Sequence, residues 1–498
     1  MPRILPTELR ELQLKVEEAA RGYGLDMFEC FYEMLDFDEV NMVASYGGFP
    51  VRYPHWKWGM EYERLSKSYE YGLHKIYEMV INNDPCYAYL MESNSTVDQK
   101  LVMCHVSGHN DFFKHNFCFQ HTNRKMIDET ANHATRIRRY IDWYGVDLVE
   151  GFVDRCLSID NLIDFQSPFI RRKDAPDAPE SAGEGGPTAK IGPALLPTNR
   201  EYMEDYINPS EFVDEQKKKQ EEAEAKAHFP IEPEQDVMLF LLENAPLQRW
   251  QQDVLAIIRE EAYYFAPQGM TKIMNEGWAC YWHSKLMTEK IMDSSDVIEF
   301  ADKHSGVVAM SPNSLNPYKL GLELYRDIEE RWNKGRFGKD WTDCDNMAER
   351  DRWDKQTGQG RDKIFQVRQI YSDLTFIDEF FTHDFCERYG FFAYEYDKKK
   401  RRYLVDTRDF GDVKNKILSS LTNMGQPMIR VTNGNFENRG ELLLEHTHEG
   451  IDLDMSYTQD TLRNLYGIWS RPVNLTTVKE ERDVIVCFDG ENFSEKML

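Results

Sequence analysis

The strongest restriction on the fold of this chain comes from two histidines that share one face of a helix. The segment KLVMCHVSGHNDFFKH lies in a helix-forming run that begins near Thr96, and it places His105 and His109 four residues apart. Since an α-helix turns by about 100° per residue, the two side chains point within about 40° of each other. Both imidazoles can therefore reach one ion, and neutral imidazole is a common ligand of Zn²⁺.

A second helical segment, MNEGWACYWH, supplies a carboxylate. Glu276, Cys280 and His283 fall on one helical stripe at i, i+4 and i+7. Two histidines from one helix and a glutamate from another are the protein ligands of a gluzincin, in which a fourth position stays open for water. The same stripe is also compatible with a packing face in which Glu276 pairs with an arginine.

The segment with the two histidines lacks the general base of a zinc peptidase. In the pattern H-E-x-x-H this base follows the first histidine, but here that residue is Val106. Asp111 lies about 200° round the helix from His109, so we expect it to face away from a bound ion.

Other residues are candidates for catalytic roles. Glu92 ends a predicted strand just before the histidine helix, and Glu129 and His133 form an i, i+4 pair on the next helix. Each could act as the base, as an additional ligand or as support for a ligand, and each could equally be structural. His283 could hydrogen-bond a developing oxyanion, and Tyr281 is a further candidate for that role.

Charge and composition exclude several classes of function. The chain has 60 Lys and Arg against 86 Asp and Glu, and this formal charge of -26 argues against binding to nucleic acid or to anionic lipid. The longest apolar run, Val237 to Leu242, is too short to span a membrane, and the N-terminus lacks an apolar signal region, so we expect a cytoplasmic protein. The nine cysteines include no C-x-x-C pair, which argues against a disulfide framework or a zinc ribbon.

The first 400 residues are expected to form one mainly α-helical domain. Between about Arg171 and Pro233 a Pro/Gly-rich and charged insertion interrupts this domain, because the proposed ligands lie on both sides of it. The pattern predicts a strand over Pro85–Met91 and helices over Thr7–Gly22, Glu61–Val80, Trp250–Ile258, Met270–Met287 and Tyr318–Trp332.

The remaining residues, 401–498, are expected to form a ferredoxin-like α+β domain. The predicted order is βαββαβ, and Asn433-Gly434 is expected to join its second and third strands. His446 and His448 lie on one face of the third strand, where they could bind a metal or simply be exposed. The predicted elements are strands over 403–406, 428–432, 441–446 and 483–488 and helices over 412–422 and 457–469.

Several separated motifs resemble one bacterial family. HVSGHNDFFKHNF, NHATRIRRY, NEGWACYWH and NRGELLLEHTHEG are similar, in the same order, to motifs of the stage V sporulation protein R (SpoVR) family. This resemblance covers nearly the whole chain. It implies a cytoplasmic protein linked to assembly of the spore cortex in spore formers, and to stress or stationary-phase physiology in other bacteria. It also implies partnership with a PrkA-type serine protein kinase and with a companion protein that has a von Willebrand-like domain.

The EGWA portion also resembles that of certain gluzincin peptidase-like families. This second resemblance implies that His105, His109 and Glu276 bind Zn²⁺ or another divalent metal. The predicted fold is therefore a mainly α, gluzincin-like metal-site core followed by the ferredoxin-like domain.

Three functions are compatible with these features. The first is a zinc-dependent hydrolase of an amide or peptide bond, with a peptide or a muropeptide-like cell-wall precursor as substrate. The alternative is a non-catalytic, metal-stabilised scaffold or regulator that acts with the kinase and the von Willebrand-like partner. A di-iron oxygenase ranks third, because it requires Glu-x-x-His on facing helices, whereas Glu129/His133 and Glu379/His383 are four residues apart.

Overall fold

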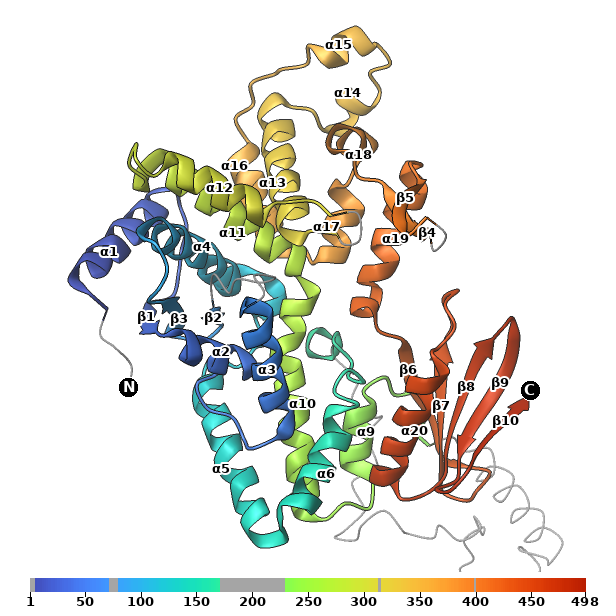
Figure 1. Cartoon of the computed structure of the whole chain (residues 1–498). Helices are drawn as coiled ribbons and strands as arrows, with labels where there is room; N and C mark the ends of the chain where they lie inside the picture. Colours follow the sequence, from blue (N-terminus) through green and yellow to red (C-terminus); the bar gives the residue numbers. More distant parts are fainter. Residues whose placement is uncertain (1–4, 71–78, 171–228, 312–314, 398–399) are drawn as a thin grey trace, which may run out of the picture. The chain divides into compact units, whose positions relative to one another are not determined.

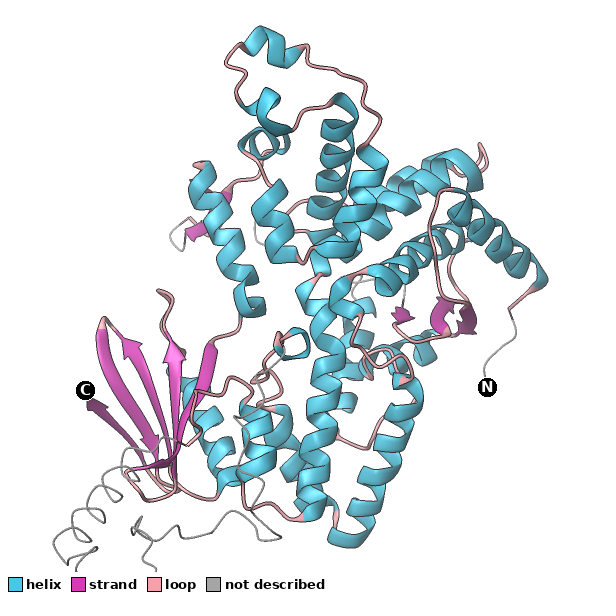
Figure 2. Cartoon of the chain, turned by 180° about the vertical axis from the view of Figure 1, so that it is seen from behind, coloured by secondary structure: helices cyan, strands magenta, loops and turns pink. Residues whose placement is uncertain are grey.

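The computed structural model of the protein describes residues 5–70, 79–170, 229–311, 315–397 and 400–498. Helices dominate, and the largest sheet lies near the C-terminus (Figures 1 and 2). Most of the predicted insertion, residues 171–228, lies outside the described residues. Among the described residues, no helix combines the length and apolar character that crossing a bilayer requires.

By packing, the chain forms two compact units, each made of two segments. The first comprises Met1–Gly151 and Glu260–Gln426, and the second comprises Phe152–Arg259 and Pro427–Leu498. The expected boundary after residue 400 stays a prediction, because compact packing alone does not show which parts fold independently.

The first unit begins with helices around a small sheet. Strand β1 (Cys30–Leu35) runs parallel to β3 (Cys86–Met91), and β2 (Met79–Ile81) pairs antiparallel with β3. The predicted helix over Glu61–Val80 is wrong at its C-terminal end, because Val80 lies in β2 beside Ala88 of β3 and therefore has extended backbone. Helices in this part are α1 (Thr7–Gly22), α2 (Phe37–Ser45), α3 (Trp56–Glu70), α4 (Thr96–His115) and α5 (Met126–Tyr144).

Helix α11 (Lys272–Leu286) packs between α4 and α13 (Pro317–Lys334), and these three helices form the centre of the first unit (Figure 1). Ser95 begins α4 with a capping box to Asp98, which satisfies amide groups at the helix start. Nearly every residue of α4 from Val97 to Phe113 is buried, including its polar residues. The helix that carries the two histidines is therefore a core helix.

Short helices and one hairpin complete the first unit. The hairpin consists of β4 (Ala393–Asp397) and β5 (Arg402–Thr407). The helical elements are α12 (Val297–Val307), α14 (Gly338–Thr342), α15 (Met347–Asp351), α16 (Gly360–Ile370), α17 (Asp373–Phe380), α18 (His383–Tyr389) and α19 (Phe410–Leu421), together with a π-helical turn over Met287–Ile291. Helices α6 (Val146–Leu157) and α10 (Arg249–Met270) contribute residues to both units.

The second unit contains α9 (Val237–Asn244) and a five-stranded sheet. The strand order is β10-β9-β8-β7-β6, antiparallel throughout except for β7 and β8, which run parallel and are connected through α20. Helix α20 packs on β8 and β9 through buried residues such as Leu462 and Leu465. The elements are β6 (Met428–Phe436), β7 (Glu441–Thr447), α20 (Met455–Trp469), β8 (Val473–Lys479), β9 (Arg482–Phe488) and β10 (Phe493–Met497).

The predicted ferredoxin-like order is therefore wrong. Strand β5 pairs with β4 instead of joining this sheet, and none of its residues is fully buried. The strands β8 and β10 differ from the expected order, because the buried positions of β8 include the polar residues Asn474 and Thr477 and β10 is mostly exposed. Asn433-Gly434 lies inside β6, and the turn follows it, where Glu437, Asn438 and Gly440 have positive φ.

Candidate functional site

The structure brings the three predicted metal ligands together. Oε2 of Glu276 lies 3.6 Å from Nε2 of His105 and 3.4 Å from Nε2 of His109. One ligand atom from each residue lies within 4.8 Å of the other two. Two atoms bound tetrahedrally to zinc at about 2.0–2.1 Å are about 3.4 Å apart, so the observed spacing matches that of a ligand set.

Small residues allow this convergence. A Cβ on Gly108 of α4 would lie 2.7 Å from Cα of Ala279 on α11, and a Cβ on Gly277 would overlap the backbone of Gly321 on α13. These contacts let α11 approach both neighbours closely, which brings the carboxylate of Glu276 to the histidines of α4. The glycine and alanine of NEGWA are thus explained by helix packing.

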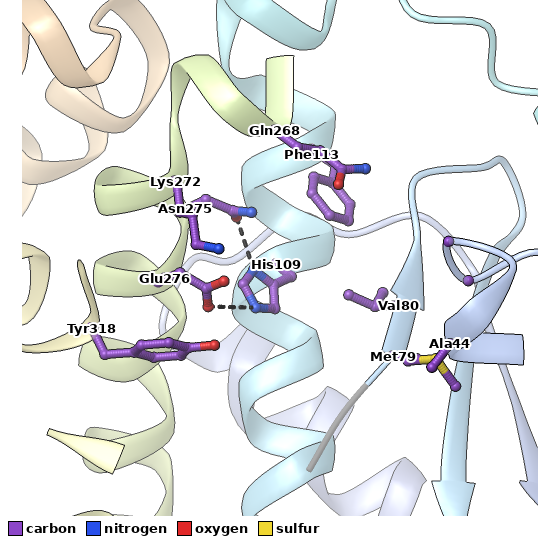
Figure 3. A pocket seen from close by; sticks show the side chains of 12 residues that line it. Ala44, Met79, Val80, His109, Phe113, Gln268, Lys272, Asn275, Glu276 and Tyr318 are labelled. Atoms are coloured by element: carbon purple, nitrogen blue, oxygen red, sulfur yellow. Dashed lines mark hydrogen bonds and ion pairs between the residues drawn. The ribbon is translucent and has the colours of Figure 1, made fainter. Parts of the chain in front are cut away.

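The hydrogen bond of His109 fixes which ring nitrogen faces the carboxylate. Nδ1 of His109 lies 2.8 Å from Oδ1 of Asn275, a carbonyl oxygen that can only accept, so Nδ1 carries the hydrogen (Figure 3). In a neutral ring Nε2 then directs a lone pair at the oxygen of Glu276. Either a cation between the two atoms or a protonated imidazole makes this contact attractive.

A second hydrogen-bond chain supports His105. Its Nδ1 lies 2.7 Å from Nδ1 of His283, and Nε2 of His283 lies 2.9 Å from Nδ1 of His304 on α12. Burial, followed by the positive charges of Arg326 and Lys319, lowers the pKa of His304. The row of hydrogen-bonded histidines therefore ends in the imidazole of His304, which is neutral at neutral pH.

Cys280, His105 and His283 also place ligand atoms within 4.8 Å of one another, and all three are buried. Nevertheless, the 2.7 Å between the Nδ1 atoms of the histidines is a hydrogen-bond distance. Two nitrogens on one zinc ion would be about 3.4 Å apart. The distance therefore matches a hydrogen-bonded histidine pair here, whereas the spacing around Glu276 matches that of a ligand set.

Electrostatics keep Glu276 ionised. Burial alone would raise the pKa of its carboxyl, but His105 and His109 in their protonated form outweigh burial and hold this pKa well below its usual range. Another buried carboxylate, that of Asp373, accepts hydrogen bonds from the backbone amides of Ile273 (2.7 Å) and Met274 (2.9 Å) at the start of α11. Burial raises the pKa of Asp373 to about 7, although these two hydrogen bonds lower it.

A cavity of about 330 Å³ lies beside the proposed ligands. Figure 3 shows Glu276 and His109 on its wall, with Lys272 and Asn275 of α11 next to them and Gln268 from the end of α10 beside Phe113. Its polar lining residues are His109, Gln268, Lys272, Asn275, Glu276 and Tyr318, and the others are Ala44, Gly47, Gly48, Met79, Val80 and Phe113.

The four candidate catalytic residues do not line this cavity. Glu92 is exposed directly after β3, at the N-terminal end of α4, whereas His105 lies near the middle of that helix. His283 lies next to His105, and both of its ring nitrogens are hydrogen-bonded to other histidines. Glu129 and His133 lie on α5. Their catalytic roles stay predictions.

His133 is buried and belongs to a network of charged groups in the first unit, of which Glu260 is exposed. Its Nδ1 lies 3.2 Å from Glu261 and its Nε2 lies 3.4 Å from Glu260, while Arg52 pairs with Glu261 at 2.9 Å. Burial lowers the pKa of His133, but the hydrogen bonds to the two glutamates outweigh burial and raise this pKa to about 9. The ion pairs with the two glutamates therefore explain why His133 is buried, without a catalytic role for it.

The structure also places three other residues that the sequence pointed to. Asp111 faces away from the proposed ligands, as predicted, and contacts Arg368 (2.7 Å) and Trp278 (2.9 Å). Tyr281 donates to Glu329 and does not line the cavity. His446 bonds Thr477, and no metal-binding group among the described residues includes it.

Sequence reasoning missed several residues of the site. Lys272 lies four residues before Glu276 on the same helix, so helical spacing could have identified it. Asn275 precedes Glu276 directly, but adjacency alone does not indicate that it contacts His109. Tyr318 and His304 come from other helices, and nothing in the sequence pattern connects them with the site.

Comparisons with known proteins agree with the motifs. The family described as "SpoVR like protein" matches residues 4–426, and the "SpoVR-like C-terminal domain" matches residues 427–480. The chain is 28% identical to the protein "Uncharacterized protein YcgB" of Escherichia coli (strain K12), over 94% of this chain and 92% of the relative. No solved structure matches the chain. The likeness of the core to a gluzincin thus stays a prediction.

Proposed function

Because the chain belongs to the SpoVR family, a family whose name specifies no reaction, we propose a function from the geometry of its site: a metal-dependent hydrolase of amide bonds. The observation that carries the proposal is the convergence of His105, His109 and Glu276 at the wall of a cavity. The donor set of two imidazoles and one carboxylate suits Zn²⁺ first. When bound there, such an ion would polarise a carbonyl group and lower the pKa of a bound water.

The surrounding residues have distinct roles in this proposal. Asn275 holds the ring of His109, and His283 holds the ring of His105, so that each presents Nε2 to the site. Tyr318 lines the cavity and is the candidate to donate a hydrogen bond to a developing oxyanion. In the reaction water adds its oxygen to the carbonyl carbon, one of its protons passes to the amide nitrogen, and the C–N bond breaks to release an amine and a carboxylic acid that keeps the other proton.

Metal binding is tested by titrating zinc into the purified protein, with metal content and calorimetry as readouts. We expect one ion per chain, and a free zinc concentration of 100 times the Kd should stabilise the fold by about 2.7 kcal/mol. Glu276→Gln and His109→Ala should lose most of this binding. His115→Gln is the matched control, since His115 lies on the same helix but contacts Asp26. Equal zinc affinity in wild type and Glu276→Gln would refute the site.

Hydrolysis is tested separately with peptide and muropeptide substrates. We expect turnover that a chelator abolishes and zinc restores. Glu92→Gln, Glu129→Gln and His133→Gln test the sequence-based candidates for the base, and a true base should lower turnover by about 10²-fold or more. A cytoplasmic location and a link to sporulation, cortex formation or stress physiology belong to the same proposal, through the family resemblance.

One observation favours the alternative of a non-catalytic scaffold. Among the described residues, Glu276 is the only carboxylate that lines the cavity, so no second carboxylate is placed there to act as a base. In this alternative the metal stabilises the core, and the protein acts with a PrkA-type kinase and a von Willebrand-like partner. Zinc binding without hydrolysis of any tested substrate, together with direct binding of the kinase, would support it.

A further inference from the structure

The cavity contains a cation that metal binding does not require. Lys272, the first residue of α11, lines the cavity one helical turn before Glu276 (Figure 3). Its side chain is exposed, and within the described part of the chain it forms no ion pair. An ammonium group in this position is available to a bound ligand.

The charges of the site favour an anionic ligand. If a divalent cation is bound, it and the carboxylate of Glu276 would together leave one positive charge, to which Lys272 adds a second. The chain as a whole carries -26, so its long-range field repels anions, and a local cation is needed to hold one. The cavity therefore suits a ligand that has a carboxylate close to the reacting bond.

The remaining lining indicates what else the ligand carries. Ala44, Met79 and Val80 form an apolar part of the wall, across the cavity from the polar residues of α11, and Phe113 adds apolar surface beside Gln268 (Figure 3). The volume of about 330 Å³ is near the lower end of the range of ligand sites, about 300–1,000 Å³. It accommodates one apolar amino-acid side chain rather than a long stretch of peptide.

We propose that this cavity binds the C-terminal residue of a peptide, an apolar amino acid whose free carboxylate pairs with Lys272. This inference rests on the proposed function, which places the amide bond to be cleaved at the metal. Lys272 would then select the last amide bond of a peptide over bonds in its interior. A free apolar amino acid has the same carboxylate as the C-terminal residue of a peptide. It differs from that residue in its free α-amino group, so the two ligands can be distinguished in a binding test.

The test is calorimetric binding of N-acetyl-leucine, N-acetyl-leucinamide and free leucine to the full-length, zinc-loaded protein. We expect N-acetyl-leucine to bind about tenfold more tightly than N-acetyl-leucinamide. A hydrogen bond to a charged group contributes enough free energy to raise an affinity by about this factor. Lys272→Met should remove this preference and Lys272→Arg should keep most of it. Lys339→Met is the matched control, since Lys339 is an exposed lysine that does not line the cavity.

Two results would overturn the inference. Equal affinities of wild type for the acid and the amide would show that the carboxylate is not recognised. Tighter binding of free leucine than of N-acetyl-leucine would assign the cavity to a free amino acid.

Repeating the titrations in Glu276→Gln separates this inference from the proposed function. That variant lacks a proposed metal ligand, so a preference for the acid that still depends on Lys272 upholds the inference even if no metal binds the wild type. The opposite result is a preference for the acid over the amide that persists in Lys272→Met but is lost in Glu276→Gln. It would show that the ligand carboxylate binds the metal, and it would refute the role of Lys272.

Discussion

At the scale of single residues, His283 acts through another side chain. Its Nδ1 contacts Nδ1 of His105 at 2.7 Å, and this hydrogen bond orients the ring that presents Nε2 to Glu276. We predict that His283→Gln lowers zinc affinity by about 10–100-fold, because a residue that orients a metal ligand typically has such an effect. His115→Gln serves as the control. A zinc affinity equal to that of wild type, measured by calorimetry, would exclude this role.

His133 gives a prediction for pH dependence. Its pKa is raised from 6.5 to about 9 in the folded protein, where Glu260 and Glu261 stabilise the protonated ring. Its contribution to stability is therefore fully present below about pH 6.5 and is lost as the pH rises through about 9. The difference in free energy of unfolding between wild type and His133→Gln, from urea titrations at pH 6 to 9.5, should shrink across that range. A difference that grows with pH would contradict this assignment.

At the scale of helices, the close approach of α11 and α13 depends on a pair of glycines. A Cβ on Gly277 would overlap the backbone of Gly321, so Gly277→Ala must push the helices apart. We predict a loss of about 1–3 kcal/mol in the free energy of unfolding, together with weaker zinc binding, because Glu276 is displaced from the histidines. Urea unfolding and zinc calorimetry measure the two effects.

Gly59→Ala is the matched control. Gly59 lies in the exposed part of α3, and a Cβ there would have no neighbour within 4 Å. Since alanine has the higher helix propensity, we expect Gly59→Ala to be neutral or to stabilise by up to about 1 kcal/mol. If Gly59→Ala and Gly277→Ala changed stability and zinc binding alike, close helix packing at Gly277 would not explain the effect of Gly277→Ala.

At the scale of the whole molecule, the site is built entirely from the first unit. His105, His109 and Glu276 all lie there, whereas residues 171–228 are flanked in sequence by residues of the second unit. We therefore predict that deleting Pro176 to Pro197 leaves zinc content and affinity unchanged, as measured on the purified variant. Loss of soluble protein, or of zinc from soluble protein, would contradict this prediction.

The sequence by itself determined the local features of this protein. The span of α1 (Thr7–Gly22) and the start of α4 at Thr96 match the predicted pattern, because helix periodicity and the Ser95 cap act over a few residues. His105 and His109 share a face for the same reason, and Asp111 faces away. The prediction that Glu276 joins these two histidines in one site did not rest on residue spacing alone. The resemblance to peptidase-like families also indicated it.

Only the tertiary structure decided which distant residues meet. Tyr318 and Lys272 reach one cavity because α11 packs closely on α4 and α13, and helix periodicity carries no information about which helices become neighbours. The same limit applies to the C-terminal sheet, where β5 joins β4 while β8 pairs with β7 and β9. Strand pairing depends on burial against other elements, and a short strand without a buried face does not reveal its partner.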